Sequence, residues 1–238
     1  MSEGFLLWSY LSSGQLLWLW VTLVAYAAGD WAFRASGRNP LANPVMLAVI
    51  LLACVLWGTG TPYQSYFEGA QFVHFMLGPA TVCLAIPLHA NLGKLRRALV
   101  PILVALVMGS LTAVAVALGV AKGLGAGPEL LASLAPKSAT APVAIGIAEA
   151  LGGEPTLTAV LVLLTGMIGA IVVTPLLNLF GFKDWRARGF AVGVAAHGIG
   201  TARAFQVHET AGAFASIGMG LNAVLTAFLA PVVLRLFL

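Results

Sequence analysis

Two short segments combine a cation, hydroxyl groups and helix-breaking residues within apolar sequence. In the first, Pro136 and Pro142 bracket Lys137, Ser138 and Thr140. Proline lacks a backbone donor and disfavours helix at the residue before it. We therefore expect unwound backbone here, with Lys137 beside the free amides that begin a helix near Pro142, an arrangement that binds anions. The alternative is a lysine whose ammonium reaches the lipid headgroups.

The second segment contains His197, Gly198, Gly200, Thr201 and Arg203. Its glycines let the backbone approach a ligand closely, and the spacing is not a dinucleotide fingerprint because the third glycine is absent. Arg203 could bind a carboxylate through two parallel hydrogen bonds, and His197 could titrate near neutral pH. The alternative is a helix break that packs tightly against a neighbour, with the histidine merely hydrogen-bonded.

Two glutamates and an asparagine are further candidates. Glu149 and Glu209 follow the two segments, where they could pair with the cations or carry a proton, or instead lie at the membrane interface. Asn222 lies in an uncharged stretch, 210–234, and is either a site residue or a hydrogen-bonding contact between helices.

A third interrupted segment lies upstream of these two. Gly78, Pro79 and Thr81 could line the same cavity, or the proline could simply kink a helix.

The composition indicates that membrane-spanning helices position these residues. Of 238 residues, 60% are hydrophobic and only 8% are charged, against about 25% charged in soluble domains. Soluble enzymes, nucleic-acid binders and secreted scaffolds are therefore excluded. Residues 98–121, 156–180 and 210–234 carry no charge, and each can cross a hydrocarbon core of about 30 Å as a helix. The sequence predicts an all-α polytopic protein of the inner (plasma) membrane.

Hydropathy and basic loops predict one domain, 1–238, with about seven spanning helices and one re-entrant or broken segment at 130–150. The apolar elements are 15–31, 42–58, 71–90, 98–121, 130–150, 156–180, 189–207 and 210–236. Positive residues favour the cytoplasmic side, which places the N-terminus outside and the C-terminus, near Arg235, in the cytoplasm.

Two trios of elements, 42–121 and 156–236, would then run in opposite directions. Each has a Gly/Pro-interrupted middle member, at 77–87 and 195–204. Paired interrupted segments in two oppositely oriented halves indicate a transporter with inverted repeats, including carriers of the elevator type.

Enzyme chemistry finds little support in the sequence. Zinc-protease, nucleophile-elbow and phosphate-loop motifs are absent, and Cys54 and Cys83 lie in apolar stretches as isolated small residues. A hydrolase built on Ser138 and Lys137 would need sequence neighbours to act as nucleophile and base. We therefore expect no enzyme, no metal site and no organic cofactor.

Several motifs, in the same order along the chain, resemble the LrgB/CidB family over about residues 15 to 238. They are Tyr66–Ala70, Leu77–Thr81, Leu134–Ser138, Glu149–Gly153, His197–Arg203, Glu209–Phe214 and Met219–Asn222. The chain departs from the family at Ala196, which is commonly serine, and at Ala139 and Ala141, while the charged positions are kept.

The resemblance implies two different activities. Bacterial members are described as antiholin-like proteins that modulate murein hydrolase export and autolysis, often beside a smaller LrgA/CidA membrane partner. A plastid relative in which both partners are fused is regarded as a glycolate/glycerate transporter, and bacterial relatives are linked to pyruvate. The fused relative implies that this chain works with an LrgA-like protein.

Residue chemistry favours a secondary transporter of a small monocarboxylate such as glycolate, glycerate, lactate or pyruvate. A hole-forming regulator needs no buried Lys, Arg and His in broken helices, whereas a carboxylate carrier does. Lys137 and Arg203 would bind the carboxylate, and His197 or a glutamate would couple a proton. The alternatives are a holin/antiholin-type regulator and a scaffold subunit for the LrgA-like partner. A homodimer in the lipid bilayer is expected, and a nucleic-acid partner is not.

Overall fold

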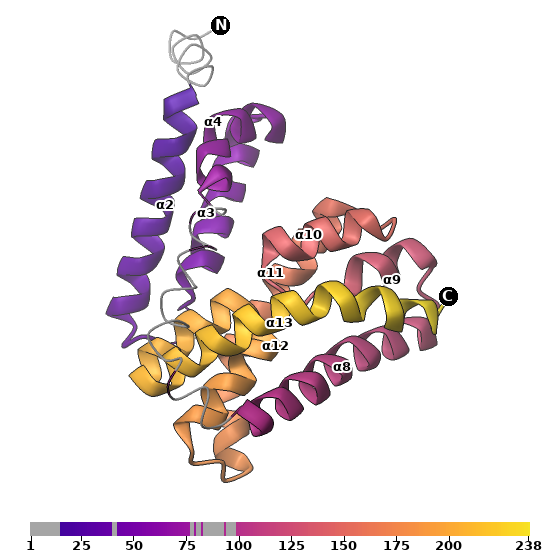
Figure 1. The fold of residues 1–238 in the computed structure, drawn as a ribbon. Helices are drawn as coiled ribbons and strands as arrows, with labels where there is room; N and C mark the ends of the chain where they lie inside the picture. The colour runs from indigo at the N-terminus through magenta and orange to yellow at the C-terminus, as the bar shows by residue number, and fades with distance from the viewer. Residues whose placement is uncertain (1–14, 40–41, 77–78, 80–81, 83–92, 94–98) are drawn as a thin grey trace, which may run out of the picture. The chain divides into compact units, whose positions relative to one another are not determined.

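The structure is a computed structural model that describes residues 15–39, 42–76, 79, 82, 93 and 99–238 (Figure 1). All regular elements in these ranges are α-helices, which confirms the predicted fold class. The chain forms two compact units, residues 1–81 and 82–238, and each is described by itself. The single domain with repeats 42–121 and 156–236 therefore stays a prediction.

The first unit contains three helices, α2 (Gln15–Ala35), α3 (Pro44–Thr59) and α4 (Tyr63–Phe75). The Tyr66 hydroxyl lies 3.1 Å from Thr22 Oγ1, and its ring meets the Trp18 ring edge-on at 5.8 Å, which ties α4 to α2. The first residues of the element expected at 71–90 belong to α4, which ends at Phe75. Most of the remainder of that element lies outside the described residues.

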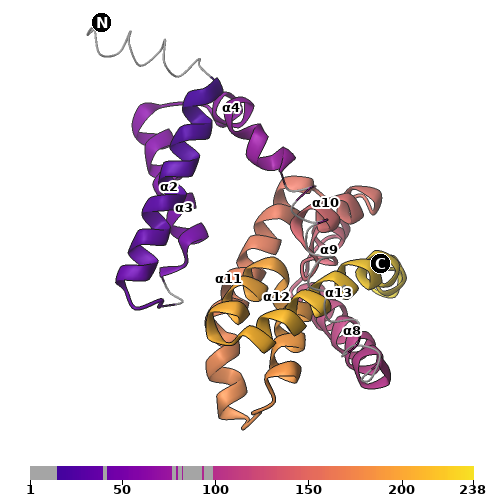
Figure 2. The same cartoon turned by 60° about the vertical axis from the view of Figure 1, so that its left-hand side comes forward.

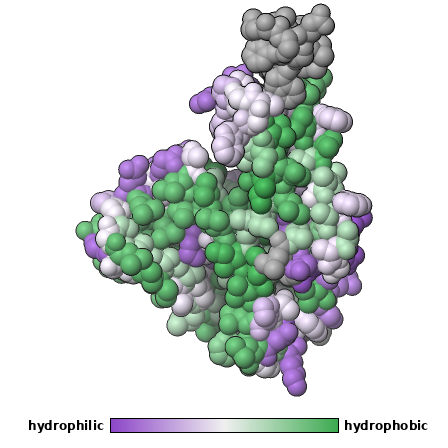
Figure 3. All heavy atoms as spheres, turned by 180° about the vertical axis from the view of Figure 1, so that it is seen from behind, coloured by the Kyte–Doolittle hydropathy of each residue, from purple (hydrophilic) through white to green (hydrophobic). Residues whose placement is uncertain are grey.

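Three long helices frame the second unit: α8 (Leu99–Gly123), α11 (Pro155–Leu179) and α13 (Glu209–Arg235). Their outer faces expose large apolar side chains such as Met108, Ile168 and Phe228. Hydrophobic residues accordingly dominate the face shown in Figure 3. Their inner faces bury polar groups such as Asn222. Polar interiors with apolar exteriors are what a lipid environment demands.

Between α8 and α11 the chain forms a helical hairpin, here called the first hairpin. Its legs are α9 (Pro128–Leu134) and α10 (Ala141–Ala150), and its tip is residues 135–140. The base is closed by Ser133, whose hydroxyl accepts from the Glu154 amide at 2.7 Å. The legs pack together through Leu131 and Ala135 against Ile147 and Leu151. The predicted break and re-entry of 130–150 thus correspond to this hairpin.

Helix α12 (Trp185–Val207) is a second hairpin, although its hydrogen bonding runs nearly unbroken. A straight helix of its 23 residues would separate its ends by about 34 Å. Instead, the Trp185 ring stacks on His208 with ring centroids 4.8 Å apart. Ala196 and His197 have non-helical backbone angles and form the tip. Val192 and Ala204, one from each leg, share a buried cluster.

The two hairpins open at opposite ends of the unit, as can be followed in Figures 1 and 2. The first joins the N-terminal end of α11, and the second follows its C-terminal end. Two apolar clusters match this arrangement. One unites Leu118 of α8 with Leu131 and Leu234, and the other unites Ile102 of α8 with Phe190 and Phe214. The hairpins therefore enter from opposite ends and point their tips inward.

The count of seven crossings is not confirmed. In the described part of the chain, four helices are long and apolar enough to span a membrane, namely α2, α8, α11 and α13. The element at 189–207 was expected to cross, and it folds back on itself because Ala196 and His197 leave helical geometry. Helix α12 is long enough to span a membrane but is less apolar than these four helices. The chain is a multi-pass helical protein.

Carboxylates begin α11 and α12 outside the long apolar runs. Glu154 accepts from the amides of Thr156 and Leu157, which lowers its pKa. Asp184 accepts from Arg186 through side chain and backbone, which lowers its pKa to about 2. A carboxylate whose pKa is lower in the folded than in the unfolded protein stabilises the fold at pH values above its unfolded pKa. This stabilisation is lost as the pH falls through its folded pKa. The α12 cap therefore stays ionised at neutral and mildly acidic pH.

The hairpins change the predicted position of the C-terminus. The Lys122 ammonium at the end of α8 donates to the Phe237 carbonyl, so the C-terminus lies at the end opposite the basic loop at 183–188. The sequence analysis placed both in the cytoplasm, and which of these two ends lies there stays a prediction. If the basic loop is cytoplasmic, we expect a protease-cleavable tag after Leu238 to be cut by protease added outside intact spheroplasts. A tag cut only in inverted vesicles would contradict this topology.

Candidate functional site at the hairpin tips

The two hairpin tips meet at Val162, near the middle of α11. The Val162 side chain packs against Ala139 of the first tip and Ala144 of the following leg. Its carbonyl accepts a hydrogen bond from His197 Nε2 of the second tip at 2.8 Å. Two segments that are 59 positions apart in sequence, at Ser138 and His197, are thus joined through one residue. The structure thus brings together two segments that the sequence analysis placed in one site, and their role in binding stays a prediction.

Glycines on α11 make room for the second tip. A Cβ on Gly166 would lie 2.6 Å from His197 Cε1 and 2.9 Å from Nε2. A Cβ on Gly169 would overlap the side chain of Ala196. Real Cβ contacts are essentially never this short, so the tip can reach the Val162 carbonyl only because α11 lacks side chains at both positions.

His197 is held in a strained and fully enclosed position. Its backbone has φ 40° and ψ −135°, a region that costs about 1–3 kcal/mol for a residue with a side chain. Its side chain is 4% exposed. Because a carbonyl can only accept, Nε2 must carry the proton, which leaves Nδ1 as the titrating nitrogen. Within the described residues Nδ1 makes no hydrogen bond, so it is the ring atom open to a ligand or a proton.

Helix α13 contacts both tips from the other side. Asn222 Nδ2 donates to the Ser138 carbonyl at 3.0 Å, while Met219 Sδ accepts from the Thr201 hydroxyl at 3.8 Å. Both residues lie near the middle of α13. The tips therefore lie between the N-terminal half of α11 and the middle of α13.

The first tip combines a cation with a helix start. Lys137 Nζ lies 3.2 Å from Ser138 Oγ. Thr140 is the N-cap of α10, yet its hydroxyl makes no capping bond. That hydroxyl is buried and without a hydrogen-bond partner in the described part of the chain. A buried hydroxyl, an ammonium and the first amides of a helix together form an environment for an anion.

The second leg of the second hairpin begins at the same place. This leg begins just after His197, where Ala196 and His197 leave helical backbone angles. Gly198 is exposed, whereas Gly200 and Thr201 are buried, and the Thr201 hydroxyl bonds back to the His197 carbonyl. Two half-helix N-termini, each with a partial positive charge, thus approach Val162.

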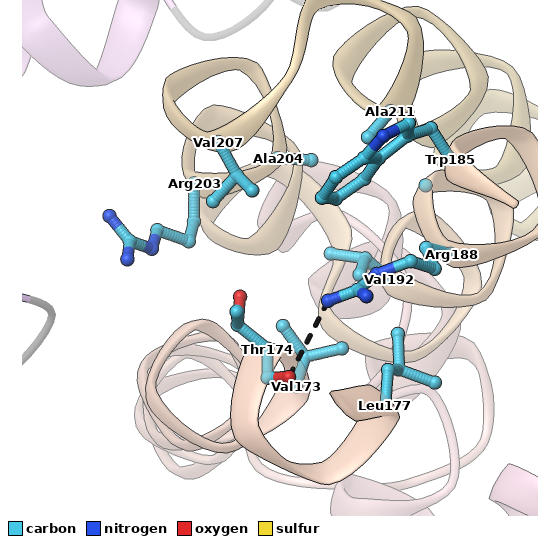
Figure 4. A pocket seen from close by; sticks show the side chains of 11 residues that line it. Val173, Thr174, Leu177, Trp185, Arg188, Val192, Arg203, Ala204, Val207 and Ala211 are labelled. Atoms are coloured by element: carbon cyan, nitrogen blue, oxygen red, sulfur yellow. Dashed lines mark hydrogen bonds between the residues drawn. The ribbon is translucent and has the colours of Figure 1, made fainter. Parts of the chain in front are cut away.

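Arg203 occupies a different place from Lys137. It lines a pocket of about 20 Å³ between the two legs of the second hairpin and α11, together with Trp185, Arg188 and Thr174. Figure 4 shows its guanidinium directed away from the other lining side chains. The pocket holds one water-sized group. A joint clamp by Lys137 and Arg203 is not seen in this arrangement.

Arg188 fills most of that pocket and is bound to backbone. It donates to the carbonyls of Phe182 at 3.0 Å and Thr174 at 3.5 Å, the second drawn in Figure 4, and stacks on Trp185 at 4.6 Å. These contacts fasten the open end of the second hairpin to the end of α11. We assign Arg188 to the support of the hairpin.

The remaining predicted residues lie outside the tips or outside the described residues. Glu149 is exposed in the last turn of α10, and Glu209 is exposed in the first turn of α13, both at open ends of hairpins. Gly78 and Thr81 lie outside the described residues, and Pro79 is exposed. In the described part of the chain, no three His, Cys, Asp or Glu residues gather as a metal site.

Sequence reasoning missed the partners on the long helices. Ser110 of α8 donates to Asn222 Oδ1 at 2.6 Å, and Thr226 contacts the same oxygen at 3.3 Å. A serine within the apolar run of α8 was a usable signal. Val162 acts through its carbonyl and Gly166 through an absent side chain, so neither carried a signal in residue type.

Comparison with known proteins settles which group this chain belongs to. The LrgB-like family matches residues 22–236. The chain belongs to the LrgB-like family. The Holin-like protein CidB of Staphylococcus epidermidis is 35% identical over 222 residues, which cover 93% of this chain and 96% of that protein. The resemblance to the LrgB/CidB family is thereby confirmed.

Two further relatives show the same breadth. The Holin-like protein CidB of Staphylococcus aureus is 34% identical over 93% of this chain and 96% of its own length. The uncharacterized protein YwbG of Bacillus subtilis is 33% identical over 91% of this chain and 96% of its own. No solved structure matches the chain.

Proposed function

We propose that this LrgB-like protein is a secondary transporter of small monocarboxylates such as glycolate, glycerate, lactate or pyruvate. The observation that carries the proposal is the meeting of two broken-helix tips at Val162, with Lys137 and Thr140 on the first tip and His197 on the second. Anion carriers use this combination, because half-helix N-termini and a cation replace the hydration of a carboxylate. No enzymatic step is proposed.

Lys137 and the Thr140 hydroxyl bind the carboxylate in this proposal, and His197 Nδ1 carries the coupled proton. The two glutamates are set aside as coupling groups because both are exposed at the open ends of the hairpins. Helices α10 and α12 bring their half-helix starts from opposite ends of α11, which is the arrangement of an inverted repeat. The repeats would then be 128–179 and 185–235, in place of the trios proposed from hydropathy.

Ligand-dependent stability of the purified protein tests the binding step. A ligand that binds the folded state stabilises it by about 2.7 kcal/mol at one hundred times its Kd. We expect glycolate and pyruvate to raise the melting temperature in a saturable way, and chloride at equal ionic strength to have no such effect. Absence of a saturable shift for every small monocarboxylate would remove the proposed site.

Arg203→Lys tests whether Arg203 belongs to the same binding site. Lysine keeps the charge and loses the planar fork that binds a carboxylate through two bonds. Because Arg203 lines a pocket separate from the tips, we expect KM and Vmax for uptake to match those of the parent protein. A rise in KM of about tenfold, the loss of roughly 1.4 kcal/mol, would place Arg203 in the carboxylate site.

A holin-like regulator of murein hydrolase export and autolysis is the second candidate. The observation in its favour is the printed name of the staphylococcal relatives. This function requires assembly rather than a buried cation. It predicts that Lys137→Ala keeps its effect on autolysis, while apolar-to-charged changes on an assembly surface abolish it.

An LrgA/CidA-like membrane protein is the proposed partner, from the resemblance to the family in which the two are fused. The carrier proposal allows for transport by this chain alone or by the pair. A scaffold subunit with no ligand of its own would show no saturable binding when purified by itself.

A further inference from the structure

Asn222 of α13 connects three separate elements through one side chain. Its Oδ1 accepts from Ser110 Oγ of α8 at 2.6 Å, and Thr226 Oγ1 of the next α13 turn lies 3.3 Å from it. Its Nδ2 donates to the Ser138 carbonyl of the first tip at 3.0 Å. The Ser138 carbonyl fixes the amide orientation, because a carbonyl can only accept a hydrogen bond. The nitrogen must therefore face the tip.

Among the described residues, the bond to Ser138 is the one side-chain hydrogen bond between α13 and the first tip, which also packs against Val162 through Ala139. Residues 135–140 contain turns stabilised by short-range backbone bonds, such as Ala139 amide to Pro136 carbonyl at 2.9 Å. Asn222 is 1% exposed, so its amide has no water to replace a lost partner. An unmade buried hydrogen bond costs about 1–3 kcal/mol, which is enough to hold a short tip in one position.

We propose that Asn222 is a positioning residue that latches the first hairpin tip closed, and that loss of its bond to the Ser138 carbonyl opens this tip toward the end of the bundle that carries the C-terminus. The inference rests on the proposed function for its purpose, since an opened tip would expose Lys137 and Thr140 to substrate from one side. The direction follows from the fold, because the first hairpin opens at the end where Lys122 meets Phe237.

The second tip is held by a different contact and stays closed when the Asn222 latch is broken. His197 Nε2 is bound to the Val162 carbonyl of α11, and Ala196 sits against Gly169 of the same helix. The described hydrogen bonds of Ser138 and His197 thus go to different long helices, α13 and α11, while Val162 of α11 also packs against Ala139 of the first tip. Breaking one latch opens one end of the site, which is the behaviour that alternating access requires.

Cysteine accessibility in vesicles tests the latch without any substrate. Cys54 and Cys83 are first replaced by alanine, and Ala139→Cys serves as the reporter because Ala139 is 1% exposed. A membrane-impermeant maleimide is added to right-side-out or inverted vesicles holding the full chain. We expect Asn222→Leu, which keeps the volume and loses the donor, to raise the labelling rate at least tenfold from the C-terminal side alone. Ser216→Ala, which removes a buried α13 hydroxyl bonded only within its own helix, is the matched control.

A second reporter separates opening from unfolding. Thr201→Cys lies in the buried second leg, and we expect it to stay unlabelled in Asn222→Leu. Labelling of Ala139→Cys that is unchanged, equal from both sides, or accompanied by labelling of Thr201→Cys would overturn the latch. One-sided labelling in a protein that shows no carboxylate binding would uphold the latch and reject the carrier proposal.

Discussion

Lys137→Ala is expected to abolish saturable carboxylate uptake while the protein still folds. Charge-assisted hydrogen bonds contribute about 1.5–3 kcal/mol, so the loss of the ammonium lowers Vmax/KM by up to about 100-fold. Lys137 is half-buried and makes its described hydrogen bond only to Ser138, so its removal breaks no tie between helices. The measurement is initial uptake rate against concentration for glycolate and pyruvate.

Lys183→Ala is the control for loss of a positive charge. Lys183 is exposed in the loop between α11 and α12, away from the tips. We expect its kinetics to match those of the parent protein. Equal loss in the two variants, or normal uptake by Lys137→Ala, would show that the cation at the first tip does not bind the carboxylate.

Gly166→Ala is the second substitution with a large expected effect. The added methyl would lie 2.6 Å from His197 Cε1 and 2.9 Å from Ile199 Cβ, and both distances are too short for contact. Overpacking of this kind costs about 1–3 kcal/mol, and relief requires the tip to move off the Val162 carbonyl. We expect Vmax to fall at least tenfold, because His197 then loses the bond that orients Nδ1.

The matched control is Gly220→Ala on α13. A Cβ at Gly220 meets nothing within 4 Å, so both variants gain the same helix propensity while only one gains a clash. We expect Gly220→Ala to transport normally. Normal uptake by Gly166→Ala would mean that the contact between His197 and Val162 has no part in transport.

The positions of the two breaks could be read from the sequence. Proline on both sides of Lys137, and glycines after His197, predicted interruptions that the structure places at residues 135–140 and at Ala196–His197. These residues encode their effect locally, through a missing amide proton or a missing side chain. Local encoding is what makes such features visible without a structure.

The return of the second hairpin could not be read from the sequence. Its fold depends on Trp185 stacking on His208 and on Val192 packing with Ala204, contacts between residues far apart along the chain. The apolar stretch at 189–207 was predicted as a crossing, although α12 is less apolar than the four helices that could span a membrane. The predicted location of the C-terminus followed from that crossing and changes with it.

The candidate site was predicted in part. The two segments were expected together, and the contact through Val162 brings them together, whereas Arg203 lies in a separate pocket between the hairpin legs. Asn222 was left open between a helix contact and a site residue, and its three hydrogen bonds connect helices and the first tip. The other contacts of the site depend on the Val162 carbonyl and on the missing side chain at Gly166, which residue types do not reveal.

Uptake of labelled glycolate and pyruvate into proteoliposomes containing this chain alone tests the carrier claim most directly. The assay is run without a proton gradient, at about pH 8 on both sides, and with an inward gradient, at about pH 5 outside. The Asp184 cap, with a pKa of about 2, stays ionised across this range and does not contribute to the response. The account predicts saturable uptake that the gradient accelerates and that Lys137→Ala abolishes. No saturable uptake, by this chain alone or with an LrgA-like partner, would contradict it and leave the holin-like function in first place.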